Sequence, residues 1–572
     1  MTRLRLAHSI VALIVGALAA LPGAAQNQRW LEQFGSLGTD DAWSIARDGV
    51  GGVFLCGVTS GGLNGPNAGL LDAWIARYDG ATGNQLWLRQ LGTGANDRAF
   101  DVAPDGSGGA YVTGDTSGSL GGTFGSGADL WLARYDSVGN QLWIRQTSSI
   151  GGGSVDAAHA AASDGSGGVY VTGFTSGSLG GPIASQADAL VARYDAAGNP
   201  LWTRQFGAGG GRTESWAAAP DGSGGVYIGG FTQTSLAAPN AGDADIWLAH
   251  YDAAGNQLWV RQLGSSSLDM LMTAAPDATG GVYVGGFTWG DLAAANAAPG
   301  DVWLARYDAS GNQHWIRQFG TNASEGINGL APDGSGGVFV SGGTSGNLGG
   351  ASAGGVDAWL ALYDSAGNQL WIRQFGTNDE DYAFGAAPDG LGGVYLAGGT
   401  KGDLGAPNAG AQDAWIARYD GVGPPPPTSY CTASTTANGC SASISANASP
   451  SVTFTSPCVL SIASVEGQRQ GLIFYGLDNT GFSPLPWSSG SSSFLCVKPP
   501  TQRTGLQSSG GAIASCSGTL SLDWNAFHAA NPGALGGAIA AGSKVYAQGW
   551  FRDPPAPKST NLSNALELTV AP

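Results

Sequence analysis

The stretch Gln369–Ala387, QLWIRQFGTNDEDYAFGAA, contains the pattern on which most of the chain is built. In it a tryptophan precedes Arg-Gln, an apolar residue and glycine, and an acidic residue and an alanine-rich run follow. The pattern occurs seven times, with its tryptophans at Trp30, Trp87, Trp143, Trp202, Trp259, Trp315 and Trp371. Spacings of 56 to 59 residues between these tryptophans indicate an architecture made of repeats.

Each unit predicts four short β-strands, as residues 87–142 show. The strand-like segments are LWLRQLG, AFDVAPDG, GGAYVTGDTSG and ADLWLARYD, and Gly, Asp and Asn separate them. No helical period is present in the unit. A unit of about 50 residues with four strands is typical of one blade of a β-propeller. The sequence therefore predicts an all-β fold.

The two ends of the repeat region are out of phase with the unit. The tryptophan strand at Arg29–Gly35 has no strand before it, and the strand at Asp413–Asp420 has none after it. Pairing these two strands would complete the last unit and remove two exposed sheet edges. We therefore predict a seven-bladed β-propeller, closed by its N-terminal strand, over residues 26–423.

The repeated motifs WIRQFG, DGSGGVYVTGFTSG and DLWLARYD resemble the bacterial SBBP β-propeller repeat, over about residues 28–423. The resemblance implies a secreted or surface protein, and that family brings no established enzymatic activity. Similarity to other propellers implies that the alanine-rich strand is innermost and the tryptophan strand outermost.

The N-terminal residues predict export. Arg3 and Arg5 precede an apolar run, Ile10–Leu21, and a small-residue cleavage site at residues 23–25, which is the pattern of a signal peptide over residues 1–25. The alternative is an N-terminal anchor helix. No other apolar run is long enough to span a bilayer. The formal net charge of −18 argues against nucleic acid or an anionic membrane as a partner.

A proline-rich linker, residues 424–428, separates the repeats from residues 429–572. The second part predicts a small disulfide-containing β module with one helical turn at Trp524–Ala530. Its motifs YCTA, GLIFYG and FLCVKPP resemble an uncharacterised C-terminal module of secreted bacterial proteins.

The cysteines of this module predict disulfides. The candidates are Cys431, Cys440, Cys496 and Cys516. Cys496 and Cys516 flank a Gly/Ser-rich loop that they could close, and Cys431 and Cys440 are close enough in sequence to pair. The resembled module has a cysteine two places from its end, where Ala571 stands here, which would leave Cys458 unpaired. A bridge from Cys458 to Cys56 is the alternative.

Two acidic residues per unit are expected on one face of the propeller. One opens the inner strand, and Glu214 is one place out of register: Asp40, Asp97, Asp156, Glu214, Asp269, Glu325 and Asp381. The other opens the strand next to the outermost: Asp72, Asp129, Asp188, Asp245, Asp301, Asp357 and Asp413. The first set would form a metal site, for a hard cation such as Ca²⁺, and the second a ligand site. The alternative is that each acid caps a turn by accepting from backbone N–H groups.

The same face carries the loops that vary most between units, and function concentrates in such loops. Trp289 lies in one of them and would stack on a ligand if it is exposed, or belong to the core if it is buried. No catalytic set is apparent: the histidines of the mature chain, His159, His250, His314 and His528, are scattered and lack zinc spacing.

The sequence thus favours a secreted, monomeric, non-enzymatic binding or scaffold protein. It would present the loop-rich face to a glycan, a cell-wall component or another protein. The alternative function is a carbohydrate-active hydrolase or lyase that uses carboxylates on the same face.

Overall fold

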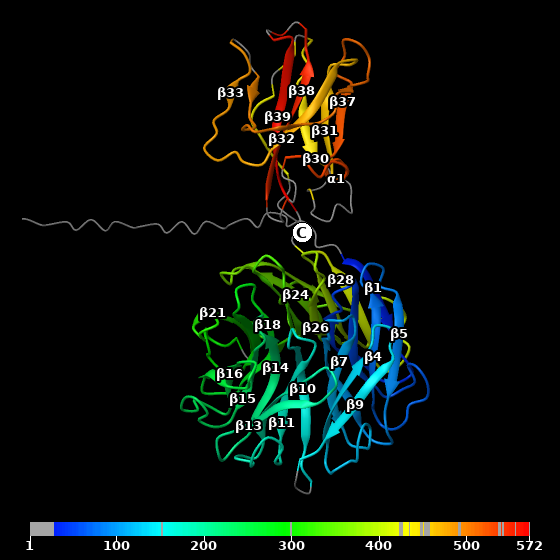
Figure 1. The fold of residues 1–572 in the computed structure, drawn as a ribbon, viewed down its shortest axis with the longest axis vertical. Helices are drawn as coiled ribbons and strands as arrows, with labels where there is room; N and C mark the ends of the chain where they lie inside the picture. The colour runs from blue at the N-terminus through cyan, green and yellow to red at the C-terminus, as the bar shows by residue number, and fades with distance from the viewer. Residues whose placement is uncertain are drawn as a thin grey trace, which may run out of the picture.

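The computed structural model describes residues 28–570 apart from 150–152, 298–299, 422–426, 434, 437, 447–449, 451–457, 490–492, 536–538, 540–542, 555 and 557. The predicted signal peptide and most of the predicted linker lie outside the described residues. Strands dominate both the repeat region and the C-terminal module (Figure 1). Among the residues described, no helix has both the length and the apolar character needed to cross a membrane.

The described strands between residues 28 and 419 form seven four-stranded antiparallel sheets, as expected for a propeller-like, all-β fold. The first strand of each sheet, called the inner strand below, is β2 (Asp40–Arg47), β6 (Asp97–Pro104), β10 (Asp156–Ser163), β14 (Thr213–Pro220), β18 (Asp269–Pro276), β22 (Glu325–Pro332) or β26 (Asp381–Pro388). The second is β3 (Gly52–Thr59), β7 (Ala110–Thr116), β11 (Val169–Thr175), β15 (Val226–Thr232), β19 (Val282–Thr288), β23 (Val338–Thr344) or β27 (Val394–Thr400).

The two remaining strands of each sheet contain the tryptophans of the repeat. The third strand is β4 (Asp72–Asp79), β8 (Asp129–Tyr135), β12 (Asp188–Tyr194), β16 (Asp245–Tyr251), β20 (Asp301–Tyr307), β24 (Asp357–Tyr363) or β28 (Asp413–Tyr419). The outer strand is β1 (Gln28–Phe34), β5 (Gln85–Leu91), β9 (Gln141–Thr147), β13 (Pro200–Phe206), β17 (Gln257–Leu263), β21 (Gln313–Phe319) or β25 (Gln369–Phe375).

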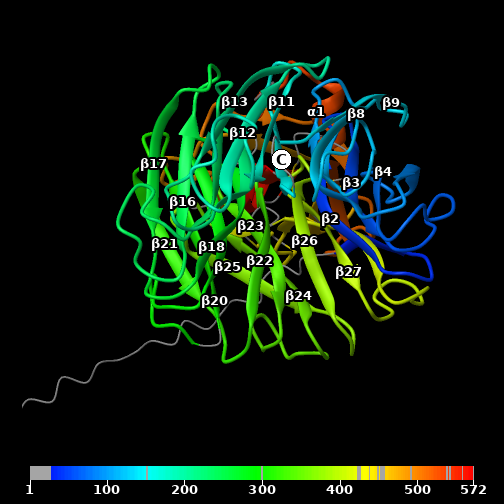
Figure 2. The same ribbon diagram turned by 90° about the horizontal axis from the view of Figure 1, so that it is seen from below.

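One sheet combines the two ends of the repeat region, because β1 pairs antiparallel with β28 in the order β1-β28-β27-β26. Inner strands of consecutive sheets contact one another from β2 through to β26, and β26 also contacts β2. In Figure 2 the sheets stand around a common centre, with β22 and β26 nearer the middle and β17 and β21 at the outside.

The cores lie between consecutive sheets, which pack face to face. The third-strand tryptophans are fully buried in them: Trp74, Trp131, Trp247, Trp303, Trp359 and Trp415. Trp131 shows how the indole N–H is satisfied, since Nε1 donates to the backbone oxygens of Asp115 (3.0 Å) and Arg98 (3.1 Å). A buried indole that keeps its hydrogen bond stabilises the sheet through its area without leaving an unpaired donor.

Every inner strand has a register shift at its fourth residue. In β6 it falls between Ala99 and Asp101, so that Phe100 has no partner across the ladder. A bulge of this kind re-aims the side chain of the extra residue. The fourth residue of each inner strand is consequently partly exposed, although the residue before it is buried.

The C-terminal module has its own core and sheets. Its strands are β29 (Thr428–Tyr430), β30 (Ser443–Ala446), β31 (Val459–Val465), β32 (Gln470–Gly476), β33 (Leu485–Pro486), β34 (Phe494–Leu495), β35 (Gln502–Arg503), β36 (Gln507–Ser508), β37 (Gly518–Asp523), β38 (Lys544–Arg552) and β39 (Thr560–Thr569). The larger sheet has the order β29-β39-β38-β32-β35, with β36 also on β32, and a smaller one has the order β30-β31-β37. The predicted helical turn is α1 (Trp524–Ala530), which Asp523 caps by accepting from the N–H of Ala526 (3.1 Å).

The four predicted cysteines form two disulfides, but the pairs differ from those predicted. The bridges are Cys431–Cys496 and Cys440–Cys516. The segments of the first bridge also meet through a hydrogen bond, because the Tyr430 hydroxyl donates to the carbonyl oxygen of Cys496 (2.9 Å). Cys56 and Cys458 are buried, and neither forms a disulfide among the described residues. Proximity in sequence was thus a poor guide to proximity across the module.

Candidate functional site

One cavity, of about 600 Å³, is lined by residues from all seven inner strands and is called the central cavity below. The bulged fourth residues contribute the side chains that differ most from sheet to sheet. They are Trp43, Phe100, His159, Trp216, Met272, Asn328 and Phe384. An otherwise repetitive scaffold therefore places five residue types at seven positions around one cavity.

Four consecutive positions form a continuous row of rings, called the aromatic arc below: Trp43, Phe100, His159 and Trp216. Trp43 and Phe100 stack with ring centroids 5.2 Å apart and 12° between their planes. Phe100 meets His159 edge to face at 5.1 Å, and His159 lies 4.0 Å from Trp216. These are favourable aromatic geometries, so the rings hold each other in place.

Behind the arc, hydrogen bonds fix two of its members. The Trp216 Nε1–H donates to Glu214 Oε2 (3.2 Å). His159 Nδ1 lies 3.2 Å from the carbonyl oxygen of Ser215, which can only accept, so the proton is on Nδ1 and Nε2 carries the lone pair. Burial lowers the pKa of His159 to about 4, so this ring is neutral at pH 7.

Asp101 is an acid that occurs in only one of the seven inner strands at its position. Its carboxylate accepts from the Ser44 hydroxyl on β2, from the N–H of Ala161 on β10 (2.6 Å) and from the N–H of Val102 (2.9 Å). Three inner strands are thereby linked through one side chain that lines the central cavity. Burial raises the pKa of Asp101 to about 6.

The second residue of each inner strand lies on the same side as the fourth. Three contacts establish this: Tyr382 stacks on Phe384 (5.4 Å, 8°), Arg98 lies over Phe100 (5.5 Å), and Glu214 accepts from Trp216. These second residues, called the rim below, stand two places before the fourth residues that line the central cavity: Asp41, Arg98, Ala157, Glu214, Met270, Gly326 and Tyr382. Like the fourth residues, they differ from strand to strand.

The arginines at this rim already have carboxylate partners. Arg98 binds Asp115 through two hydrogen bonds of 2.9 and 2.7 Å. The Arg212 Nε–H donates to Glu214 (2.6 Å). Asp41, in contrast, accepts from the Gln412 amide and has no ion pair among the described residues. Burial raises its pKa to about 6.

The predicted inner-strand acids are buried rather than exposed around the cavity. Asp97 is typical: its Oδ2 accepts from Thr93 N–H (2.5 Å) and Thr93 hydroxyl (2.8 Å), and its Oδ1 accepts from the Thr116 hydroxyl. The equivalent acids Asp40, Asp156, Asp269, Glu325 and Asp381 bind the preceding loop in the same way. This geometry favours the turn-capping interpretation of these acids.

Glu214 does not belong to this set, because Thr213 takes the position. Thr213 pairs with Thr232, as Asp97 pairs with Thr116, and the two threonine hydroxyls lie 2.9 Å apart. Glu214 is one residue further along the strand and therefore lies on the same side as Trp216, from which it accepts a hydrogen bond. Its one-residue offset in the sequence was the sign of a different role.

The second set of predicted acids holds the long loops. Asp72 Oδ2 accepts from the N–H of Ala68 (3.0 Å) and from the Gln90 amide (2.8 Å). The same pair of contacts recurs at Asp129, Asp188, Asp245, Asp357 and Asp413. Asp301 keeps both as well, at 3.2 and 3.0 Å. Within the described residues no group of three or more metal-ligating side chains is present, so the Ca²⁺ site stays a prediction.

Trp289 is 56% exposed and follows β19. It does not line the central cavity. Its interpretation as a stacking residue therefore remains a separate hypothesis about the long loops.

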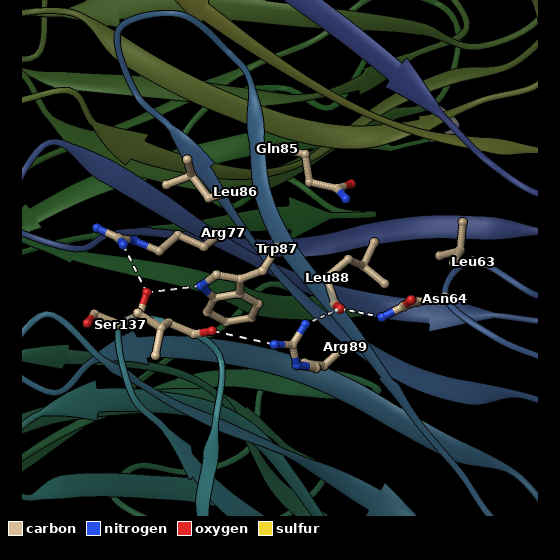
Figure 3. A pocket seen from close by; sticks show the side chains of 10 residues that line it. Leu63, Asn64, Arg77, Gln85, Leu86, Trp87, Leu88, Arg89 and Ser137 are labelled. Atoms are coloured by element: carbon tan, nitrogen blue, oxygen red, sulfur yellow. Dashed lines mark hydrogen bonds between the residues drawn. The ribbon is translucent and has the colours of Figure 1, made fainter.

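A second hollow, also of about 600 Å³, lies outside the cavity between the outer strand β5 and a turn of the next sheet (Figure 3). In it the Trp87 Nε1–H donates to the Ser137 carbonyl (3.0 Å), as Figure 3 shows. The equivalent bond recurs at Trp143, Trp202, Trp259 and Trp315. A contact repeated between most sheets is better explained as packing than as a ligand site.

Sequence reasoning missed Trp43, Phe100, Asp101 and Trp216. The motifs were compared for what they share, whereas these residues stand at positions where the units disagree. Comparing the seven units position by position would have found them, since the fourth place of the inner strand holds five residue types in seven units.

Solved structures with a similar arrangement of strands include several β-propellers. The β-propeller domain of the trilobed protease from Pyrococcus furiosus is 7% identical, with a TM-score of 0.37, and the match covers 67% of this chain and 94% of that one. An ulvan lyase is 11% identical, with a TM-score of 0.38, over 67% and 95% of the two chains. A quinohemoprotein alcohol dehydrogenase from Comamonas testosteroni is 12% identical, with a TM-score of 0.34, over 69% and 76%.

One curated protein shares sequence with part of this chain. It is the regulatory protein FlaEY of Caulobacter vibrioides, 30% identical over 161 residues, a match that covers 25% of this chain and 17% of FlaEY. The chain thus matches less than a fifth of that relative's length. At the level of the single repeat the match is to a named family: residues 86–121 are an SBBP repeat, a β-propeller repeat.

Proposed function

We propose that residues 28–421 form a closed seven-bladed β-propeller that binds an extracellular ligand in its central cavity without chemical conversion. The observation that carries the proposal is the contrast within each inner strand. The first residue is nearly constant and buried, whereas the fourth residue varies between strands and lines one cavity. Variation confined to a shared cavity is typical of a binding site on a rigid scaffold.

Closure of the propeller is supported by contacts within the sheet that joins the two ends and between that sheet and the first. Gln33 on β1 accepts from the N–H groups of Leu404 (2.8 Å) and Gly405 (2.9 Å). The Arg418 guanidinium donates to the carbonyl of Gly80 (3.4 Å), as that of Arg134 does to the carbonyl of Ala196 (2.9 Å) between two internal sheets. The junction between the ends is therefore built like the junctions between internal sheets.

An extracellular location is supported by the two disulfides of the C-terminal module, since such bonds persist in oxidising compartments. The ligand would be a glycan, a cell-wall component or an exposed part of another protein. Aromatic side chains with a few polar groups suit all three.

The alternative function, a carbohydrate-active hydrolase or lyase, is favoured by one observation. Asp101 is an acid specific to one sheet, and its pKa of about 6 suits proton transfer near neutral pH. A glycosidase needs a second carboxylate across the scissile bond. Asp41 at the rim has the same raised pKa and is the residue to test for that role.

The test is a glycan-array screen of the full chain with three proteins: the wild type, Trp216→Ala in the arc, and Trp289→Ala on the long loop. We expect binding that Trp216→Ala abolishes and Trp289→Ala leaves intact. The reverse pattern would move the site to the loops. Release of new chain ends from a bound glycan, lost in Asp101→Asn, would establish the enzymatic alternative.

A further inference from the structure

We propose that the central cavity selects ligands that carry a substituted ammonium group, such as a trimethylammonium head group. This inference rests on the proposed function, since it names the ligand class of the same cavity. It stands on two features together: the row of aromatic rings and carboxylates that have no cationic partner.

The residues of the aromatic arc line the cavity. Trp43, Phe100 and Trp216 are all partly exposed there, within one row on adjacent inner strands. Indole and phenyl faces carry the negative end of the ring quadrupole and attract cations. Recognition of quaternary ammonium groups is the characteristic use of such clusters, because the cation loses little hydration when it enters them.

The protein already places its own cations on these rings. The Arg98 guanidinium lies 5.5 Å from the centroid of Phe100 in the arc. Arg212 lies 5.7 Å from that of Phe174, which in turn is 5.3 Å from His159. Phe100 of the arc and its neighbour Phe174 thus already have guanidinium groups placed over their rings.

Near the arc, both arginines have carboxylate partners, but one carboxylate has no cationic partner. Arg98 and Arg212 are neutralised by Asp115 and Glu214. Asp101, in contrast, is bound only by a hydroxyl and by backbone N–H groups, and it has no ion pair among the described residues. A cation that enters the arc would therefore meet an uncompensated carboxylate in a site of low polarity, where the attraction is strong.

One arginine at the cavity is not neutralised in this way. Arg47 lines the cavity and makes no ion pair in the described part of the chain. It stands four residues after Trp43 on β2, which places its backbone about 13 Å further along the strand. Arg47 therefore belongs to the opposite end of the cavity from the arc.

The experiment compares choline with 3,3-dimethylbutan-1-ol, a neutral molecule of the same shape. Binding to the full chain is measured for both by saturation-transfer NMR and titration. We expect choline to bind about five- to thirty-fold more tightly, as one cation–π site with a nearby acid predicts. Asp101→Asn should remove most of this ratio, and Trp216→Ala should weaken choline binding itself.

Two controls keep the test informative. Asp243→Asn removes an exposed carboxylate from a long loop and should leave the ratio unchanged. Trp43→Ala repeats the test in the arc should Trp216→Ala fail to fold, which thermal unfolding reports. Equal affinity for the two molecules would overturn the inference, and so would choline binding that neither arc variant weakens.

Failure of the inference can be told from failure of the proposed function. If choline does not bind but a glycan binds in a manner that Trp216→Ala abolishes, the cavity is a site and the ligand class is wrong. If no ligand depends on the arc, both proposals are wrong.

Discussion

Within one inner strand, neighbouring residues are under opposite constraints. Asp97 is buried and accepts three hydrogen bonds from its own sheet and loop, so another unit can replace it only with a group that accepts in the same place. Phe100, three residues later, faces a cavity and holds no loop. The first position is therefore nearly constant among the units, and the fourth is open to change for binding.

Asp101 predicts a pH dependence of stability. Its pKa is about 6 in the folded protein, above the usual value near 3.8, so folding favours the protonated form. This contribution is complete below about pH 4 and is lost as the pH rises through about 6. Asp101→Asn cannot titrate, so its thermal midpoint should rise relative to that of the wild type between pH 4 and pH 7. A constant difference would contradict the shifted pKa, and Asp243→Asn controls for the loss of a surface charge.

An ion pair in most sheets joins the third strand to a turn, and one sheet lacks it naturally. Arg134 Nη2 lies 2.8 Å from Asp105 Oδ2. In the sheet β22-β23-β24-β25, whose equivalent turn contains Asp333, Leu362 takes the place of that arginine. Although burial opposes it, hydrogen bonds from Arg134 and Ser107 hold the pKa of Asp105 below its usual range. Its stabilising contribution is therefore present above the unfolded pKa and is lost in acid.

The missing arginine supplies a matched pair of variants. Asp105→Asn should cost about 1–2 kcal/mol more than Asp333→Asn, because only the first leaves an arginine without its carboxylate. In both sites asparagine can still accept from the turn, as Asp333 does from Ser335 and Gly337. Thermal unfolding at pH 7 measures the difference, which should shrink below pH 4. Equal losses at pH 7 would show that the pair contributes nothing.

At the scale of the element, the turn between the third and outer strands contacts the sheet before it. The Trp202 Nε1–H donates to the carbonyl of Ala253 (3.0 Å), and Arg204 Nε–H donates to that of Gly255 (3.0 Å). Gly255 has a φ of +80°, and a Cβ there would lie 2.7 Å from the Trp202 ring. Glycine is therefore required at this position for two reasons: the turn needs a positive φ, and the Trp202 ring of the neighbouring sheet leaves no room for a Cβ.

The two requirements can be separated with a second glycine. Gly222 has a similar φ of +76°, but a Cβ at this position would meet no other atom within 4 Å. Gly222→Ala should cost about 1 kcal/mol for the backbone alone, and Gly255→Ala about 1–3 kcal/mol more, because the ring of Trp202 must move. Thermal unfolding ranks the two variants. Equal thermal midpoints would show that the Trp202 ring can move aside without a loss of stability.

At the scale of the molecule, the sheets could be predicted because their strands recur in every unit. The residues that line the cavity could not, because they vary between units. The motif around Trp30 predicted the strand that pairs with Asp413–Tyr419, because the same pair recurs in every unit. Phe100 and Asp101 could not be recognised as neighbours of His159 and Ser44, because those contacts join the inner strands of adjacent units. The disulfide pairs failed for the same reason, since they join segments far apart in the sequence.

The pairing of β1 with β28 makes a final prediction for the whole propeller. Removing residues 28–35 deletes this ladder and the contacts of Gln33 with Leu404 and Gly405, and it exposes the edge of β28. We expect the thermal midpoint to fall by about 10 °C or more and aggregation to increase. Removing only residues 1–27 is the control and should leave the midpoint in place. A peptide with the sequence of residues 28–35 should partly restore the midpoint, because it can form the same backbone hydrogen bonds with the exposed edge of β28. An unchanged midpoint after deletion would mean that the ends of the repeat region are held together without β1, and the proposed closure would then be wrong.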